Sequence, residues 1–369
     1  MIISFAFVKR YHVYRLKDKK IMTIYSSSQL APAISALKNG DCIGFPTETV
    51  YGLAGNALNA NAILKIFELK KRPFFDPLIM HVSKDMDLSA WVKVTPIAQK
   101  LMKDFWPGPL TLLLKKSDLV PDLMTSGLDT AAIRCPNHPV ATAILNGVGF
   151  PLAAPSANPF GKISPTTAID VEKGLGKDLI VVDGGACLIG LESTIVDASD
   201  FDPTNDEIKI LRKGGLSEED FRQKGYTNIS YPEPLHAQSP GTLKSHYAPN
   251  KPLYLLEHTI SQAQMAQIRD PKNINTRQQK LSWLSWEKPL IQKDLQDFEN
   301  QALALTDQTG DDRLAAKSLF AKMRLLDESQ SDVIFVEPIP LQGLGQAILD
   351  RLTRASVGSA YFENGKFHF

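Results

Sequence analysis

Two cations stand where a predicted helix gives way to a strand, in the segment LKKRPFFDPLIMHV at 69–82. Lys70 continues an apolar helical stripe that includes Ile66, and Pro73 disfavours helix at Arg72, so both cations mark the end of the helix. Arginine offers a bidentate fork and lysine a point charge, which makes the pair a candidate polyphosphate clamp. The alternative is that the two side chains only complement the negative C-terminal end of the helix.

Polar side chains also interrupt other apolar segments. In FPTETVYGL at 45–53, Thr49 belongs to a loop that either holds a polar small molecule or caps the next helix. In TAAIR, strand alternation places Thr130 and Arg134 on one face. An arginine in so apolar a strand needs an anion, which is either a ligand or a structural carboxylate. His81 lies within LIMHV, where a core histidine is the simpler interpretation.

Later segments add candidates at further strand boundaries. PLAAPSAN places Ala154 and Ser156 on one face, where small side chains let a ligand approach closely. ESTIVD and LRKGG contribute Ser193 and Arg212. Because open α/β sheets bind ligands beyond their strand ends, these side chains predict one shared site.

The elements that must position these residues form two α/β units separated by a stretch rich in proline. We predict an N-terminal extension at 1–22, a first α/β domain at 23–216, a linker or lid at 217–250 and a smaller α/β domain at 251–369. The linker contains SPGTLKSHYAP, whose combination of aromatic and polar residues is unusual for a passive connection. We expect it to fold over the site as a lid, with Tyr247 available to stack or hydrogen-bond.

Composition excludes several classes of protein. The chain has 369 residues, 43% of them hydrophobic, which is enough for two folded domains. Its 41 Lys and Arg against 40 Asp and Glu argue against the broad basic surface of a dedicated nucleic-acid binder. The three scattered cysteines indicate no disulfide framework or zinc knuckle and fit a reducing cytoplasm. The apolar opening has neither the charge order of a signal peptide nor the length of a membrane anchor.

Common phosphate-binding and hydrolytic motifs are absent from the sequence. It contains no G-x-x-x-x-G-K-[ST], no G-x-G-x-x-G after a strand, no H-E-x-x-H and no G-x-S-x-G. A site built from scattered cations and hydroxyls therefore remains.

In this order the segments resemble the YrdC-like family, in its long form with a second domain, the threonylcarbamoyl-AMP synthases. The matching words are PTETVYGL, KKRP-x-x-x-PL-x-x-H, PGPLT, T-x-x-IR-x-P, APSAN, KISPT, ESTIVD, LRKGG and SPG-x-x-x-x-HYAP. The resemblance implies a YrdC-like domain with a twisted mixed sheet and a smaller Rossmann-like C-terminal α/β domain.

The resemblance also implies roles for individual residues. It implies threonine contacts from Thr49, His81, Arg134, Ala154 and Ser193. It implies ATP contacts from Arg72, Asp76, Thr130, Ser156, Ser164, Arg212 and Tyr247. Lys70 and Arg72 are the expected catalytic cations.

The implied reaction joins L-threonine, bicarbonate or CO2, and ATP into threonylcarbamoyl-AMP and pyrophosphate. Mg²⁺ is expected with ATP, and Asp76 and Glu192 are candidate ligands. Expected partners are a downstream threonylcarbamoyl transferase complex and tRNA, which receives N6-threonylcarbamoyladenosine; weak RNA binding is compatible and no membrane is expected. The alternative is a non-catalytic RNA-binding module of the same fold. A related hydrogenase maturation factor is excluded because its cysteine-rich zinc fingers are missing.

Overall fold

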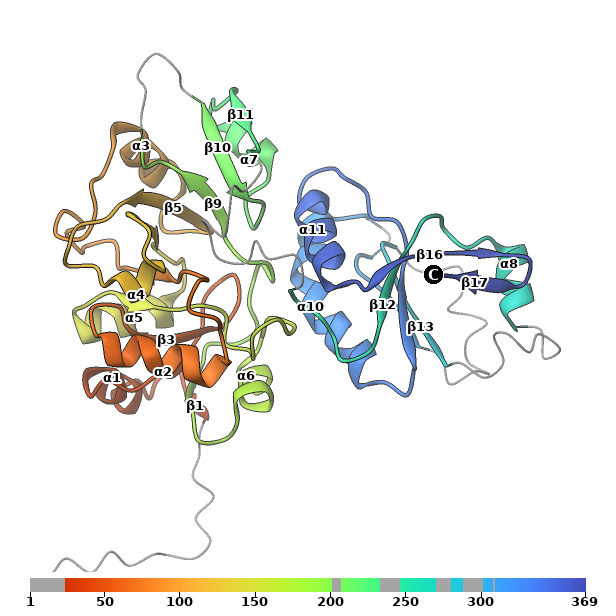
Figure 1. Ribbon diagram of the computed structural model, residues 1–369, viewed down its shortest axis with the longest axis horizontal. Coiled ribbons are helices and arrows are strands. Elements are labelled where there is room, and N and C mark those ends of the chain that lie inside the picture. Colours follow the sequence, from red (N-terminus) through yellow and green to blue (C-terminus); the bar gives the residue numbers. More distant parts are fainter. Residues whose placement is uncertain (1–23, 201–206, 233–245, 270–279, 288–300, 308) are drawn as a thin grey trace, which may run out of the picture.

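Two α/β bodies make up the protein in the computed structural model (Figure 1). The described residues are 24–200, 207–232, 246–269, 280–287, 301–307 and 309–369. The extension predicted at 1–22 and residues 239–245 of the predicted lid lie outside these ranges. The fold class is confirmed, since the structure has two sheets accompanied by helices, although the first sheet extends to Ile229–Ser230 within the segment predicted as linker. The domain boundaries themselves stay predictions.

The first sheet is mixed and has eleven strands. In spatial order they are β1 (Ile24–Ser26), β8 (Ile180–Asp183), β2 (Ile43–Phe45), β3 (Gly52–Asn56), β7 (Leu152–Ala153), β4 (Ile79–His81), β6 (Thr130–Arg134), β5 (Leu110–Lys115), β9 (Thr194–Asp197), β10 (Ile208–Arg212) and β11 (Ile229–Ser230). The central strands β4 and β6 pair in parallel, with His81 opposite Arg134. This pairing brings the ends of both strands to the same edge of the sheet.

Seven helices accompany this sheet among the described residues, and the last of them lies in the segment predicted as linker. They are α1 (Ala31–Lys38), α2 (Ala60–Lys70), α3 (Pro96–Phe105), α4 (Asp122–Thr125), α5 (Pro139–Val148), α6 (Ala168–Leu175) and α7 (Glu218–Gln223). Asn59 caps α2, because its side chain accepts from the backbone N–H of Asn61 at 2.9 Å. The buried face of α2 comprises Ala62, Ile63, Ile66, Phe67 and Lys70. This confirms the predicted stripe, which ends with the helix at Lys70.

The second sheet is parallel except at one edge. Its order is β14 (Gln301–Ala304), β13 (Leu281–Ser285), β15 (Val333–Val336), β12 (Leu253–Leu256), β16 (Gly358–Glu363) and β17 (Lys366–His368), with β17 antiparallel to β16. Helices α8 (Gln262–Arg269), α10 (Asp312–Glu328) and α11 (Gly345–Ala355) accompany it. The domain is Rossmann-like in its parallel strands and covering helices, although β15 lies between β12 and β13.

Helices α10 and α11 face the first domain (Figure 1). One hydrophobic cluster crosses the junction, joining Val50 and Leu191 of the first domain to Phe320 and Ile348 of the second. The backbone of Gly190 packs tightly against α10, since an added Cβ there would lie 2.6 Å from the Cα of Lys317. The two domains therefore share a core at this contact.

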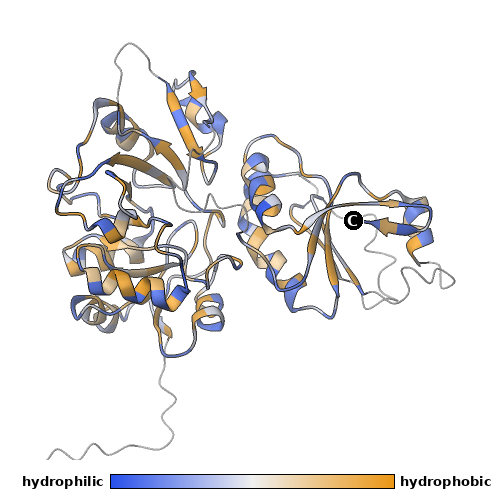
Figure 2. Ribbon diagram, viewed as in Figure 1, coloured by the Kyte–Doolittle hydropathy of each residue, from blue (hydrophilic) through white to orange (hydrophobic). Residues whose placement is uncertain are grey.

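Hydrophobic residues gather in the strands of both sheets (Figure 2). The strands β13 and β15 are buried at every position, as expected for central strands of a parallel sheet covered by helices. Among the described residues, no helix is both long and apolar enough to cross a membrane.

Candidate active site

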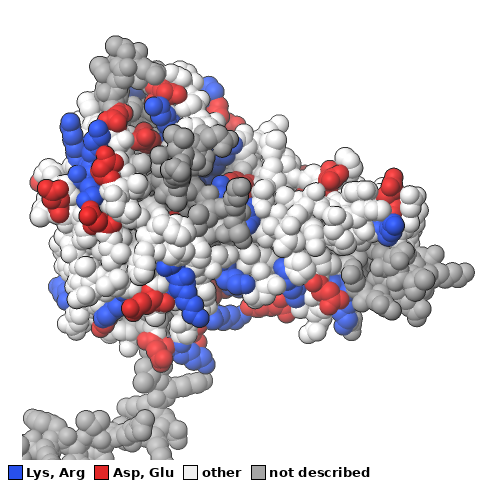
Figure 3. Space-filling model, viewed as in Figure 1, with Lys and Arg blue, Asp and Glu red and all other residues white. Residues whose placement is uncertain are grey.

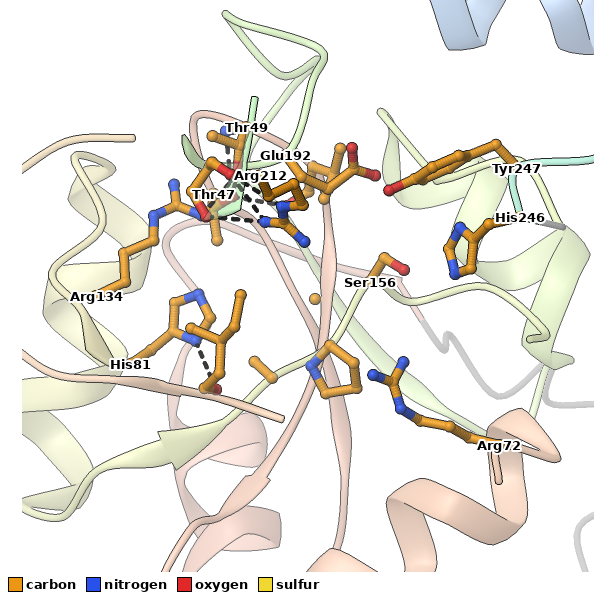
Figure 4. Close-up of a pocket in the computed structure, with 16 residues that line it drawn as sticks. Thr47, Thr49, Arg72, His81, Arg134, Ser156, Glu192, Arg212, His246 and Tyr247 are labelled. Carbon is orange, nitrogen blue, oxygen red and sulfur yellow. Dashed lines mark hydrogen bonds between the residues drawn. The ribbon is translucent and has the colours of Figure 1, made fainter. Parts of the chain in front are cut away.

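A pocket lies where strand ends of the first domain meet His246 and Tyr247 of the chain between the domains. It is lined by Thr47, Thr49, Val50, Gly52, Arg72, Ile79, His81, Arg134, Ala154, Pro155, Ser156, Glu192, Ser193, Arg212, His246 and Tyr247. Figure 4 shows two ends: Thr49, His81 and Arg134 lie at one, and Arg72 and Tyr247 at the other. Three arginines therefore reach one cavity from separate elements.

At the first end, Arg134 joins a chain of hydroxyls. Its Nη1 donates to Thr49 Oγ1 at 2.8 Å. Thr47 donates to the Val50 carbonyl at 2.6 Å, so the Thr49 hydroxyl must be the donor in the 2.9 Å contact with Thr47. Glu48 forms an ion pair with Arg134 at 2.8 Å, and both side chains are buried. The structural carboxylate that the sequence left open as a partner of Arg134 is therefore present.

His81 stands on the cavity wall at the end of β4. Its Nδ1 lies 3.3 Å from the Ile79 carbonyl, and its ring meets Phe45 edge-on. Burial and the Arg134 cation lower the pKa of His81 to about 3. The imidazole is therefore neutral at physiological pH and adds no charge to this end of the cavity.

At the opposite end, Arg72 is held by the loop that follows α2. Its Nη2 lies 2.8 Å from Asp76 Oδ2 and donates to the Pro77 carbonyl at 2.9 Å. Asp76 is completely buried and does not line the cavity. This carboxylate meets a guanidinium, so its negative charge is balanced without a ligand.

Lys70 lies behind the cavity wall instead of on it. Its Nζ donates to the carbonyls of Ser156 at 2.5 Å and Asn158 at 2.6 Å. Burial, aided by Arg72, holds the pKa of Lys70 well below its usual value. The lysine therefore fixes the loop that carries Ala154 and Ser156.

Arg212 orders Ser193 in a similar way. Its Nη2 donates to the Ser193 carbonyl at 2.8 Å and to the Ser193 hydroxyl at 3.1 Å. The same hydroxyl lies 2.7 Å from Thr111 Oγ1 on β5. Burial lowers the pKa of Arg212 to about 10, which leaves it protonated at neutral pH.

Glu192 is the one acidic side chain among the described residues that line the cavity. Its Oε1 accepts from the Ser164 hydroxyl at 2.6 Å, and its Oε2 accepts from Arg351 Nε at 2.8 Å. Burial alone would raise the pKa of Glu192, but Arg351, Arg212 and the Ser164 hydroxyl together hold it below its usual value. Glu192 is therefore an ionised, fully engaged carboxylate.

Tyr247 comes from the chain between the domains and has a left-handed backbone, with φ of 64°. Its ring stacks on Phe320 of α10 at 5.5 Å and meets His246 edge-on at 4.1 Å. Burial raises the pKa of Tyr247 to about 12, so its hydroxyl keeps its proton. The lid residues 239–245 that precede it lie outside the described residues.

The structure brings most, but not all, of the predicted residues to this cavity. Those on the wall are Thr49, Arg72, His81, Arg134, Ala154, Ser156, Ser193, Arg212 and Tyr247. Those not on the wall are Lys70, Asp76, Thr130 and Ser164. Thr130 begins β6 and Arg134 ends it, which separates the two by about 13 Å at 3.3 Å per residue. The ligand contacts assigned to all of these residues stay predictions.

Sequence reasoning missed Arg351 and His246. His246 lines the cavity next to Tyr247. Its position in the motif HYAP could have identified it from the sequence. Arg351 lies on the buried face of α11 together with Ile348 and Leu352. A cation on an apolar helical stripe, the signal that identified Lys70, was present there too.

The candidate magnesium ligands do not form a metal site of their own. Within the described ranges, no group of three or more His, Cys, Asp or Glu side chains could hold a metal ion. Asp76 faces Arg72, and both oxygens of Glu192 already accept hydrogen bonds. These carboxylates therefore do not fit a resident magnesium ion.

Comparison with known proteins gives consistent matches along the chain. The Sua5_yciO_yrdC family, described as telomere recombination, matches residues 35–214. The domain described as threonylcarbamoyl-AMP synthase, C-terminal domain, matches residues 208–357.

Curated relatives and a solved structure extend this similarity over most of the chain. The chain is 36% identical to the threonylcarbamoyl-AMP synthase of Pyrococcus abyssi, over 88% of this chain and 93% of the relative. It is also 36% identical to the threonylcarbamoyl-AMP synthase of Bacillus subtilis, over 89% of this chain and 93% of the relative. The crystal structure of P. abyssi Sua5 complexed with L-threonine superposes with a TM-score of 0.78 at 33% identity, covering 92% of this chain and 99% of that one.

Proposed function

Because this chain belongs to the threonylcarbamoyl-AMP synthase family, we propose that its cavity binds L-threonine and ATP side by side and joins them through a carbamate. The overall reaction converts L-threonine, bicarbonate and ATP into threonylcarbamoyl-AMP, pyrophosphate and water. The observation that carries this proposal is the convergence of Arg72, Arg134 and Arg212 on one cavity that also presents hydroxyls and a neutral imidazole.

Threonine would occupy the end with Arg134, Thr49 and His81. A guanidinium is suited to the amino acid carboxylate, and a neutral histidine does not repel the amine that must react. The relative with a TM-score of 0.78 was solved in complex with L-threonine, which supports threonine as the ligand. The small side chain of Ala154 leaves room between the two ends.

ATP would occupy the other end, near Arg72 and Tyr247. Bicarbonate takes up a proton and loses water to give CO2, and the deprotonated amine of threonine attacks the CO2 carbon, releasing one proton and leaving a carbamate. A carbamate oxygen then attacks the α-phosphorus of ATP, and the bond to the β-phosphate oxygen breaks to release pyrophosphate. This step transfers an adenylyl group, so the enzyme class that we propose is a nucleotidyltransferase.

The residues of this chain act in the reaction by position and charge. Arg72 and Arg212 stand where they can balance the negative charge that develops on pyrophosphate. Lys70 contributes indirectly, through the loop that it holds in place. Magnesium would enter with the triphosphate as part of the substrate.

The labile adenylate implies an acceptor system. We propose that a threonylcarbamoyl transferase complex consumes it and modifies tRNA. The three cysteines are buried and free, which agrees with the cytoplasm as the compartment of this reaction.

The non-catalytic RNA-binding module is the second candidate. On the face drawn in Figure 3, Lys and Arg side chains are interspersed with Asp and Glu instead of forming one basic surface. The cations that do converge are buried in the cavity. These features favour small-molecule chemistry over binding of a nucleic-acid backbone.

The deciding measurement is pyrophosphate release by the purified protein with ATP, magnesium and bicarbonate. Reactions with L-threonine, serine, valine and no amino acid are compared, and threonylcarbamoyl-AMP is identified by mass spectrometry. We expect release that depends on threonine and on bicarbonate. No such release from a folded protein, together with an RNA gel shift that persists without ATP, would favour the RNA-binding module.

A further inference from the structure

Arg351 of the second domain is completely buried at the contact with the first domain. It lies on α11, and its Nε donates to Glu192 Oε2 at 2.8 Å. Its Nη2 donates to the Lys213 carbonyl at 2.9 Å, and its Nη1 donates to Asp350 at 2.7 Å. Each nitrogen of the guanidinium thus has a partner, which fixes the orientation of the side chain.

Arg351 does not line the cavity, but two groups that it contacts do. One is Glu192, whose second oxygen accepts from Ser164 at 2.6 Å. The other is Tyr247, whose ring centre lies 5.2 Å from the guanidinium carbon of Arg351. A single side chain from the second domain therefore supports both a carboxylate and an aromatic ring of the cavity.

The negative charge of Glu192 is the reason that its contact with Arg351 affects the site. Glu192 shares the wall with Arg72 and Arg212, at a place where a triphosphate would also need cations. Without Arg351, a buried carboxylate would lose its direct partner and be drawn to the arginines of the cavity. It would then compete with the phosphates for the same guanidiniums.

We propose that Arg351 is a positioning residue for ATP, which holds Glu192 and the Tyr247 ring in place so that the cavity arginines stay available to the nucleotide. This inference rests on the proposed function. It gives the second domain a defined part in the reaction, because α11 supplies the residue.

The simpler alternative is that Arg351 only holds the two domains together. A matched control exists, because Arg313 at the start of α10 also pairs with a carboxylate outside the second domain, Asp220 on α7, at 2.7 Å. That pair lies at the surface, with 63% of the Arg313 side chain exposed, and neither residue lines the cavity. Arg313→Met therefore removes an interdomain ion pair without touching the site.

The test compares full-length wild type with Arg351→Met, Arg351→Lys and Arg313→Met. Threonine-dependent pyrophosphate release gives kcat and a KM for each substrate, and calorimetry gives the Kd of a non-hydrolysable ATP analogue. We expect Arg351→Met to raise the KM for ATP and the Kd of the analogue by about 10- to 100-fold, the range seen when a group that orients a metal ligand is removed, which is the nearest comparison. The KM for threonine should change less than the KM for ATP. Arg351→Lys should give an intermediate loss of ATP affinity, because a lysine ammonium keeps the positive charge but not the planar hydrogen-bond donors of the guanidinium.

A double variant tests the route through Glu192. If Arg351 acts by holding this carboxylate, Glu192→Gln/Arg351→Met should lose about as much ATP affinity as the worse single variant, not the product of both losses. Arg313→Met should leave the KM for ATP unchanged whatever it does to Tm. Should Arg351→Met fail to fold, Arg351→Lys and Glu192→Gln carry the same comparison.

Other outcomes separate the two proposals. An Arg351→Met variant with a lower Tm but an unchanged KM and analogue Kd would overturn the positioning role. A wild type that binds the ATP analogue but releases no pyrophosphate with threonine would refute the proposed function, and the analogue Kd of the variants would still decide the role of Arg351. A wild type that does not bind the analogue at all would overturn both.

Discussion

Arg134 and Glu48 form a buried ion pair beside the cavity, with Nη2 2.8 Å from a carboxylate oxygen and each side chain only 4% exposed. Arg134 also donates to Thr49 and, at 3.2 Å, to the Gly108 carbonyl. Its charge is thus balanced before a ligand arrives. A threonine carboxylate at this position must therefore bind to the guanidinium N–H groups of Arg134 that are not already used by Glu48, Thr49 or Gly108.

Arg134→Ala should therefore affect both activity and stability. We expect threonine-dependent pyrophosphate release to fall by at least about 100-fold, the scale for losing a preorganised donor. We also expect the free energy of unfolding to fall by about 3–5 kcal/mol, because Glu48 is left buried without its cation. Adding Glu48→Gln should restore much of the stability and none of the activity. Near-normal turnover of Arg134→Ala would show that threonine is not held there.

Lys70→Met should loosen the loop that carries Ser156. Two carbonyls would lose their donor, each at a cost of about 1–3 kcal/mol in the free energy of unfolding. Amide exchange at 154–158 should become faster, and the KM values for both substrates should rise, because the loop serves both ends of the cavity. Lys65→Met on the same helix is the control, since its ion pair with Asp41 is exposed and should contribute little to the free energy of unfolding. Unchanged exchange at 154–158 in Lys70→Met would contradict this role.

For Lys70, the sequence predicted the position of the side chain but not its hydrogen-bond partners. Helical periodicity placed it correctly on the buried face at the end of α2. Its partners could not be inferred, because the Ser156 carbonyl is 86 residues away in the chain. Every residue has a backbone carbonyl, so the residue types do not show which carbonyl accepts a hydrogen bond. The same limit applies to Arg351 and Glu192, which are 159 residues apart and meet only because the two domains pack together.

The strand ends were more predictable than the polar partners. Alternation along β6 separated the face that carries Arg134 from the opposite face, and the parallel pairing with β4 brought Arg134 beside His81. The same alternation grouped Thr130 with Arg134, although the two lie at opposite ends of β6. Face and position along a strand are separate properties, and only the face is encoded in the alternation.

Gly190→Ala should separate the domains slightly and weaken ATP binding. The new Cβ would lie 2.6 and 2.7 Å from backbone atoms of α10, which cannot move without shifting the helix. Gly149→Ala is the matched control, because Gly149 has nearly the same φ, 76° against 77°, but no atom within 4 Å of a Cβ. Both variants should lose about 1 kcal/mol to backbone strain, and only Gly190→Ala should raise the KM for ATP. Equal KM values in the two variants would mean that this contact does not affect the cavity.

The buried imidazole of His246 predicts a loss of stability in mild acid. Burial lowers its pKa to about 3, so the folded protein keeps it neutral, while an unfolded chain binds a proton below about pH 6.5. The unfolded state then holds more protons, so the free energy of unfolding should fall as the pH drops from 6.5 towards 3, by up to about 1.4 kcal/mol per pH unit for this group. Urea unfolding between pH 7 and 4 should show a shallower decline in His246→Gln than in wild type. Parallel curves for wild type and His246→Gln would contradict a neutral, buried His246.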